Sequence, residues 1–196
     1  MISEISRRSD IEPASRGQSL VEMAMWLTVI IFLVGGMVDV VLFGLQVVKV
    51  NAGARAGARL AVDLDPTVSD GLGCTATQDF YTLIECITDD TLKREGVSLG
   101  GSQDDIVISV VTLQGGAVTA RSTESYMGNQ ATRMTDGELS SRAAGGPDSG
   151  MVVVEVFHNY VPFLGLRFIQ GLLTPIQNGL PAYAMATMPL PDAAPS

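Results

Sequence analysis

One long apolar stretch near the amino end dominates the pattern of hydrophobic positions. Residues 23–38 contain no charged side chain, and after Asp39 the apolar stretch continues to Val48. As a helix, sixteen residues span about 24 Å, whereas the hydrocarbon core of a bilayer is about 30 Å thick. With the apolar residues that flank it, one helix can therefore cross a membrane if Glu22 and Asp39 lie near opposite faces. A buried core helix is the alternative, but a domain of this size does not need a helix that is apolar on every side.

No proline interrupts residues 18–61, so the pattern predicts a single helix of about 66 Å that crosses the membrane and continues as a stalk. Gly53 and Gly57 in the stalk have the spacing of small residues that lets two helices approach closely. Arg55 and Arg59 are four residues apart and share another face of the helix. The face that carries the two glycines has two possible packing partners: the chain's own body or a second subunit.

Beyond residue 62 the pattern indicates a small α+β domain. Apolar residues recur at helical spacing between Thr77 and Glu95, which predicts an amphipathic helix that ends at Gly96. Three strands are expected at residues 106–113, 117–120 and 151–157, with a hairpin turn at residues 114–116. The fold class is therefore a long amino-terminal helix followed by a small antiparallel sheet that is backed by an amphipathic helix.

The remaining segments have weaker patterns. Residues 122–150 are polar and rich in glycine, which predicts a flexible or partner-contacting loop. The apolar stretch 162–173 contains one charge and is too short to span a bilayer, so it lies at the membrane interface or covers the sheet. From Pro181 onward a short extended piece leads into a disordered, proline-rich end. The expected division is a leader (1–17), a membrane and stalk helix (18–62), an acidic domain (63–181) and a tail (182–196).

The charge is unevenly distributed along the 196 residues, whose net charge is −9. Residues 63–196 contain 16 acidic and 6 basic side chains. An acidic body lacks the basic surface that phosphate backbones require, so nucleic-acid binding is not expected. Cys74 and Cys86 are the only cysteines, and such a pair suits an oxidising compartment. We therefore expect the amino end inside the cell and the body outside, with either a Cys74–Cys86 disulfide or two free buried thiols.

Residue types that would indicate catalysis do not converge in the sequence. His158 is the only histidine, and one histidine without a converging group of ligands makes no metal site. Neither a nucleophile elbow, a phosphate loop nor a glycine-rich dinucleotide motif is present. The sequence therefore predicts a protein that is not an enzyme and that has no cofactor or metal.

The junction between the leader and the apolar helix has the most specific pattern. RGQSLVE at residues 16–22 places a hydrophilic leader directly before the helix and one carboxylate, Glu22, a turn inside it. A carboxylate at the start of an apolar helix is costly unless it is paired or protonated. If the chain were cut after Gly17, the new amine of Gln18 could pair with Glu22 of its own or a neighbouring chain. A secretory signal peptide is disfavoured because its apolar run would be only about 7–15 residues long.

Residues 16–62 resemble the TadE-like region of pilin-related proteins from tight-adherence (Tad/Flp) pilus systems. The matching elements are RGQSLVE at 16–22, the acid Asp39 within GMVD, and ARAGAR at 54–59. The resemblance implies a precursor that a membrane prepilin peptidase cuts between Gly17 and Gln18, with Glu22 and Asp39 serving assembly. It also implies contacts with other pilins, with the inner-membrane assembly platform and with membrane lipid. Met23, Thr28 and Ala56 depart from the family pattern, which often has Phe, Pro and an acid there.

Two functions follow from these patterns. The first is a minor pilin or pseudopilin that is inserted in the inner membrane, cut after Gly17 and then located in a pilus or at the cell surface. The alternative is an uncleaved single-pass membrane protein whose acidic domain binds an extracellular ligand. Residues Gly17 and Glu22 discriminate between them, because only the first function depends on both.

Overall fold

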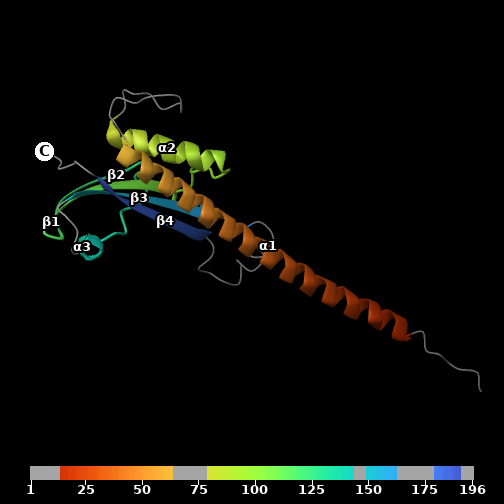
Figure 1. The fold of residues 1–196 in the computed structure, drawn as a ribbon. Coiled ribbons are helices and arrows are strands. Elements are labelled where there is room, and N and C mark those ends of the chain that lie inside the picture. Colours follow the sequence, from red (N-terminus) through yellow and green to blue (C-terminus); the bar gives the residue numbers. More distant parts are fainter. Residues whose placement is uncertain (1–13, 64–78, 144–148, 163–178, 191–196) are drawn as a thin grey trace, which may run out of the picture.

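In the computed structural model, a long helix projects from one side of a small domain (Figure 1). The structure describes residues 14–63, 79–143, 149–162 and 179–190, and side chains from Gln18 onward. Three helices and four strands occur in these ranges, which confirms the expected α+β class. Their bounds are α1 Ala14–Asp63, α2 Phe80–Arg94, β1 Asp105–Gln114, β2 Ala117–Ser125, α3 Asp136–Ala143, β3 Ser149–Tyr160 and β4 Leu180–Leu190.

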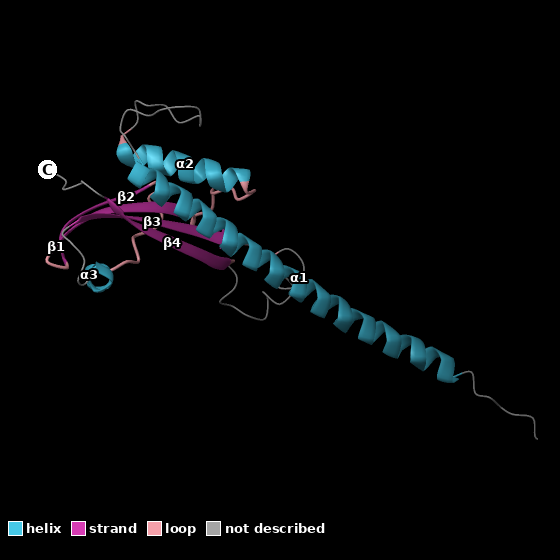
Figure 2. Cartoon of the chain, in the orientation of Figure 1, coloured by secondary structure: helices cyan, strands magenta, loops and turns pink. Residues whose placement is uncertain are grey.

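The four strands form one antiparallel sheet in the order β2-β1-β3-β4. The carboxyl-terminal half of α1 and α2 lie over one face, and α3 lies on the other (Figure 2). Because side chains alternate across a strand, β3 supplies both faces. Its Val152, Val154 and Val156 belong to the core shared with α1 and α2, whereas Val153 packs with Leu139 of α3. The sheet thus separates a larger core from a smaller one.

The second half of α1 is a core helix of the domain and not a free stalk, which corrects the sequence-based expectation. Val50, Ala54 and Ala58 are fully buried and pack with residues of α2 and the sheet. Small side chains at these positions let the sheet and α2 approach the helix axis closely. The pattern of Gly and Ala therefore reflects packing within the chain.

The expected second helix and hairpin are confirmed, with slightly different ends. Asp79 caps α2, because its carboxylate accepts the backbone N–H of Thr82 at 2.9 Å. Gly96 ends the helix with a φ of 76°, a conformation that glycine adopts without steric cost. Gly115 and Gly116, with φ values of 59° and 79°, make the two-residue turn between β1 and β2.

Composition predicts a flexible or partner-contacting loop at residues 122–150, but the described part of this stretch contains strand and helix. The strand β2 extends to Ser125, residues 136–143 form α3, and β3 already begins at Ser149. In the connection after β2, the backbone N–H groups of residues 127, 129 and 130 donate to the side chain of Asp105 on β1. This connection is held by polar contacts to a strand that is distant in sequence, and such contacts leave no periodic signal in the local sequence.

Residues 180–190 form the edge strand β4, although the sequence-based division ends the domain at residue 181. Their backbone pairs with β3 along its whole length, from Leu180 opposite Tyr160 to Leu190 opposite Gly150. Small side chains at 182, 184 and 186 face the core that contains α1. Most of the predicted apolar segment 162–173, most of the leader and Cys74 lie outside the described residues.

Candidate functional site

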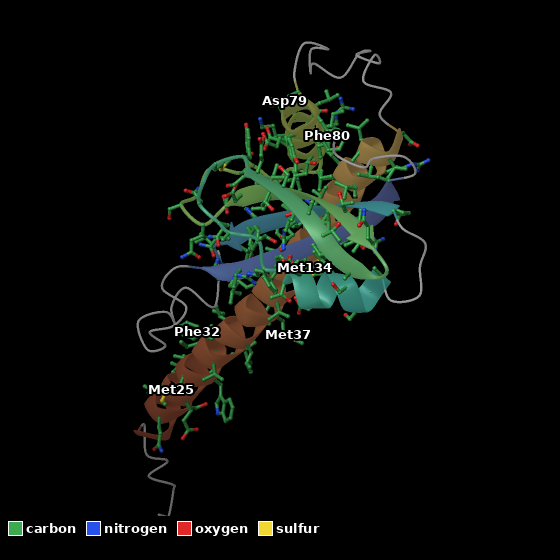
Figure 3. All side chains as sticks on the ribbon, turned by 90° about the vertical axis from the view of Figure 1, so that its left-hand side faces the viewer. Met25, Phe32, Met37, Asp79, Phe80 and Met134 are labelled. Carbon is green, nitrogen blue, oxygen red and sulfur yellow. The ribbon has the colours of Figure 1, made fainter. Side chains whose placement is uncertain are left out.

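The first half of α1 exposes its apolar side chains, and the rest of the described chain does not cover them. Figure 3 shows Met25, Phe32 and Met37 on the part of the helix that extends beyond the sheet. Most of the large hydrophobic side chains from Leu20 to Val41 are more than 45% exposed. Within the described residues, α1 is the one helix that is long and apolar enough to cross a membrane, a test that a signal sequence also passes. Its amino-terminal half is consistent with a membrane anchor.

The predicted processing site lies at the start of this helix. Gly17 and Gln18 belong to α1, which begins at Ala14, so the helix starts slightly before the predicted junction. Gln18 and Glu22 are both exposed, one helical turn apart. This placement gives the two residues access to a peptidase or a neighbouring helix, but cleavage and a role of Glu22 stay predictions.

Asp39 marks the point at which α1 enters the domain, and its side chain is fully buried. The ring of Phe43, one turn further, lies 5.9 Å from that of Tyr160 at the end of β3. Burial raises the pKa of Tyr160, and the nearby charge of Asp39 raises it further. The carboxylate is therefore turned toward the chain's own domain and is not exposed on the surface of the helix. Along the helix it lies about 26 Å from Glu22, so the structure does not bring the two acids together.

Gly53 and Gly57 pack against α2 of the same chain, which favours the first of the two partners left open. A Cβ atom on Gly53 would lie 2.6 Å from Cδ2 of Leu92, and one on Gly57 would overlap the hydroxyl of Thr88. Only glycine allows this approach of the two helices. Arg55 and Arg59 do not take part, because both are exposed. Arg59 forms an ion pair with Asp63 at 3.8 Å, on the helix itself.

The buried carboxylate Glu155, in the middle of β3, was not predicted from the sequence. Its side chain is fully buried and accepts hydrogen bonds from the hydroxyl of Thr132, from the backbone N–H of Arg133 at 3.0 Å and from the hydroxyl of Tyr183 at 2.7 Å. Burial and the hydrogen bond to Glu155 raise the pKa of Tyr183, so the phenol remains a donor. The acid thus fixes the segment before α3 and the strand β4 to the sheet. The single acidic residue among the valines of β3 was the feature of the sequence that could have indicated a buried acid.

Arg121 on β2 joins the same network from the other side. Its guanidinium donates to the hydroxyls of Ser109 and Thr132 at 3.1 and 2.6 Å, to the carbonyl of Met134 at 2.8 Å and to the carboxylate of Asp136 at 3.0 Å. Met134 lies beneath the sheet next to α3 (Figure 3). Because these donors meet acceptors within the domain, the network stabilises the fold and does not form a reactive centre.

Neither the cysteines nor the histidine form a reactive centre among the described residues. Cys86 is half-buried on α2, and its predicted partner Cys74 lies outside the described residues, so the disulfide stays a prediction. His158 has its Nδ1 at 3.4 Å from a carboxylate oxygen of Asp104. In the part of the chain that the structure describes, His, Cys, Asp and Glu do not form a group of three that could hold a metal.

Comparison with known proteins gives one match. Residues 17–59 match the model of a family described as TadE-like protein. Searches of curated proteins and of solved structures found no match. The matched segment contains Gly17, Glu22, Asp39 and both glycines that contact α2, and it covers the exposed half of α1 and most of the buried half. Over residues 17–59, about a fifth of its length, the chain is therefore similar to TadE-like proteins.

Proposed function

We propose that this protein is a minor pilin or pseudopilin of a Tad-type pilus. The observation that supports this most strongly is the division of α1 inside the family match: an exposed apolar half for the membrane and a half built into a folded domain. Proteins of this family are associated with the Tad pilus machinery and are generally not enzymes.

In this proposal, a prepilin peptidase cuts the chain between Gly17 and Gln18 while α1 crosses the inner membrane. The amino end faces the cytoplasm, and the acidic domain lies outside. Because Glu22 is exposed one turn beyond the new amine of Gln18, it can pair with that amine on its own or a neighbouring pilin. Mature protein then joins the assembly platform and other pilins through the exposed half of α1. In the same oxidising compartment, Cys74 and Cys86 form a disulfide.

The test separates processing from assembly in the cells that produce the protein. Gly17→Ala should leave the leader attached and block surface pili. Gly44→Ala is its matched control, because a Cβ on Gly44 meets no atom within 4 Å. Glu22→Gln should permit processing but reduce assembled pili at least about tenfold, as expected from losing a pair in a medium of low dielectric. Asp63→Asn, which removes an exposed acid at the other end of α1, should assemble normally.

Normal assembly of both the Gly17→Ala and the Glu22→Gln proteins would contradict this function. That result would favour the uncleaved membrane protein with an extracellular ligand-binding domain. In that protein, replacing residues 18–38 by an unrelated membrane helix would preserve the activity.

A further inference from the structure

A cavity of about 210 Å³ lies beside β3 and β4, at the end of the sheet nearest to Asp39. Its polar lining includes Gln103, Gln130, Arg133 and His158, and its aromatic lining includes Phe157 and Tyr183. No carboxylate is among the lining residues, all of which the structure describes. In a body with a large excess of acidic residues, a cavity lined by an arginine, a histidine and amides is a local site for an anion.

Arg133 supplies the permanent positive charge of this cavity. Its guanidinium lies 5.1 Å from the ring centre of Phe157 and 5.0 Å from that of Tyr183. Contact with aromatic rings holds a guanidinium in place without consuming its N–H donors. No carboxylate in the described ranges forms an ion pair with Arg133, whose side chain is exposed. The donors are therefore available to an anion such as a phosphate, which arginine binds with two parallel hydrogen bonds.

The acids behind the cavity are occupied by the protein itself. Asp104 accepts the backbone N–H groups of Gly100, Gly101 and Asn159 at 3.0, 2.8 and 2.7 Å, and it also faces Nδ1 of His158. Glu155 likewise accepts hydrogen bonds from three donors of the protein. Asp104 holds Nδ1 of His158, whose ring lines the cavity, and the Nε2–H of the ring can donate to an anion beside Arg133 when both ring nitrogens carry a proton.

The position of the cavity along α1 indicates which anion reaches it. Gly57 is next to Val154, and Phe43 contacts Tyr160, so β3 runs antiparallel to α1. The cavity residues 157–159 therefore lie beside the part of α1 just beyond Phe43. On its outer side α1 still exposes apolar side chains at this height, up to Val48, which is 66% exposed. If α1 crosses the membrane, the cavity lies at the level of the lipid headgroups, which extend about 5–8 Å beyond the hydrocarbon core.

We propose that this cavity binds the phosphate of an anionic phospholipid headgroup, with Arg133 as the main contact and His158 as the second. The lipid source rests on the proposed function, in which α1 crosses the membrane, whereas the phosphate chemistry rests only on the cavity. A bound headgroup would fix the height and tilt of the domain relative to the membrane, which the single helix alone leaves free.

The first experiment tests the phosphate chemistry without a membrane. Full-length protein in neutral detergent is titrated calorimetrically with glycerol 1-phosphate, and glycerol serves as the uncharged control. Arg133→Gln should weaken the affinity about tenfold or more, the usual loss for one charge-assisted hydrogen bond. Arg94→Gln removes an equal charge from an exposed arginine that pairs with Asp90 on α2, and it should change the affinity less than about twofold. Circular dichroism confirms that both variants are folded.

The second experiment identifies the source of the phosphate. Thermal unfolding of the full chain is compared in nanodiscs of phosphatidylcholine and in nanodiscs that also contain phosphatidylglycerol. Specific binding should raise Tm by about 2–4 °C in the anionic discs, and Arg133→Gln should abolish the rise while Arg94→Gln keeps it. Non-specific charge effects predict the opposite sign, because the acidic body is repelled by anionic lipid.

The outcomes separate the two parts of the proposal. Binding of glycerol 1-phosphate that depends on Arg133, together with the rise in Tm, supports the headgroup site. Binding without any effect of phosphatidylglycerol supports a site for a soluble phosphate ester and overturns the lipid source. This result would not contradict the proposed function in pilus assembly. Absence of binding, or equal binding by the Arg133→Gln protein, overturns the site.

Discussion

The two halves of α1 differ both in the size of their apolar residues and in their surroundings. From Leu20 to Val38 the large side chains are exposed, whereas from Val50 to Ala61 a stripe of small side chains is buried against α2 and the sheet. Asp39 separates the halves and is buried although it is an acid. The comparison shows that small residues specify packing against a protein partner, and that large apolar residues on every side suit a lipid environment.

The largest expected effect concerns the network that closes the domain around the buried half. Glu155→Ala should lower the free energy of unfolding by about 4 kcal/mol, because the donors from Thr132, Arg133 and Tyr183 lose a buried acceptor. Urea unfolding in detergent, followed by far-ultraviolet circular dichroism, measures this. Glu95→Ala, at an exposed position after α2, should stay within about 0.5 kcal/mol of the parent. Equal losses in both variants would refute a special role for the buried acid.

Two glycines of α1 should respond to alanine with opposite signs. In the buried half, Gly57→Ala forces Cβ against Thr88 and should cost about 2–3 kcal/mol of unfolding free energy. Closer to the exposed half, Gly44→Ala meets no atom and should leave the domain as stable or raise the helix stability by up to about 1 kcal/mol. The same urea measurement compares them. A stable Gly57→Ala protein would mean that α2 does not pack on α1 as described.

Matched valines give the most direct comparison of the two environments. Val50→Ala, at a fully buried position, should cost about 2 kcal/mol of unfolding free energy through lost burial and the cavity that remains. Val34, which is 55% exposed, loses the same atoms in Val34→Ala but should leave domain unfolding unchanged. If both substitutions were equally destabilising, the first half of α1 would also be part of the folded core.

A smaller effect is the dependence of domain stability on pH through Glu85. Burial raises its pKa to about 7, and the charges of Glu124, Asp79 and Asp105 add to the shift. The folded state thus binds this proton more tightly than the unfolded chain, whose pKa is near 4.5. The contribution of protonated Glu85 to the free energy of unfolding is complete below about pH 4.5 and is lost as the pH rises to about 7. The free energy of unfolding changes by on the order of 2 kcal/mol over this range.

Urea unfolding at several pH values between 5 and 8 checks this direction. Glu85→Gln should remove most of the dependence and should be more stable than the parent protein at pH 8. A parent protein that becomes more stable as the pH rises through this range would show that other groups outweigh Glu85.

Local signals in the sequence were sufficient for several elements of this structure. The turn at Gly115–Gly116, the end of α2 at Gly96 and the strand around Ile108 each follow from residues that are close in the chain. The exposed half of α1 also followed from composition, because an uncharged apolar run of this length is typical of a membrane helix.

Long-range pairing accounts for what could not be predicted. Asp105 and Glu155, which lie on other strands, hold the residues between β2 and α3. The extended piece expected after Pro181 is a strand of the sheet because it pairs with β3, a pairing that the local sequence does not indicate. The partner of Gly53 and Gly57 was undecided for the same reason, since spacing predicts close approach but not which helix approaches. The cavity beside Arg133 is formed by residues from several separate segments, so no motif in the sequence indicates it.

The amino terminus of the membrane-extracted protein tests the central claim most directly. Intact mass and peptide sequencing on protein from its own cells should show a mature chain that begins at Gln18, which would establish processing between Gly17 and Gln18. A chain that retains residues 1–17 in cells with an active prepilin peptidase would contradict the account and leave an uncleaved membrane protein.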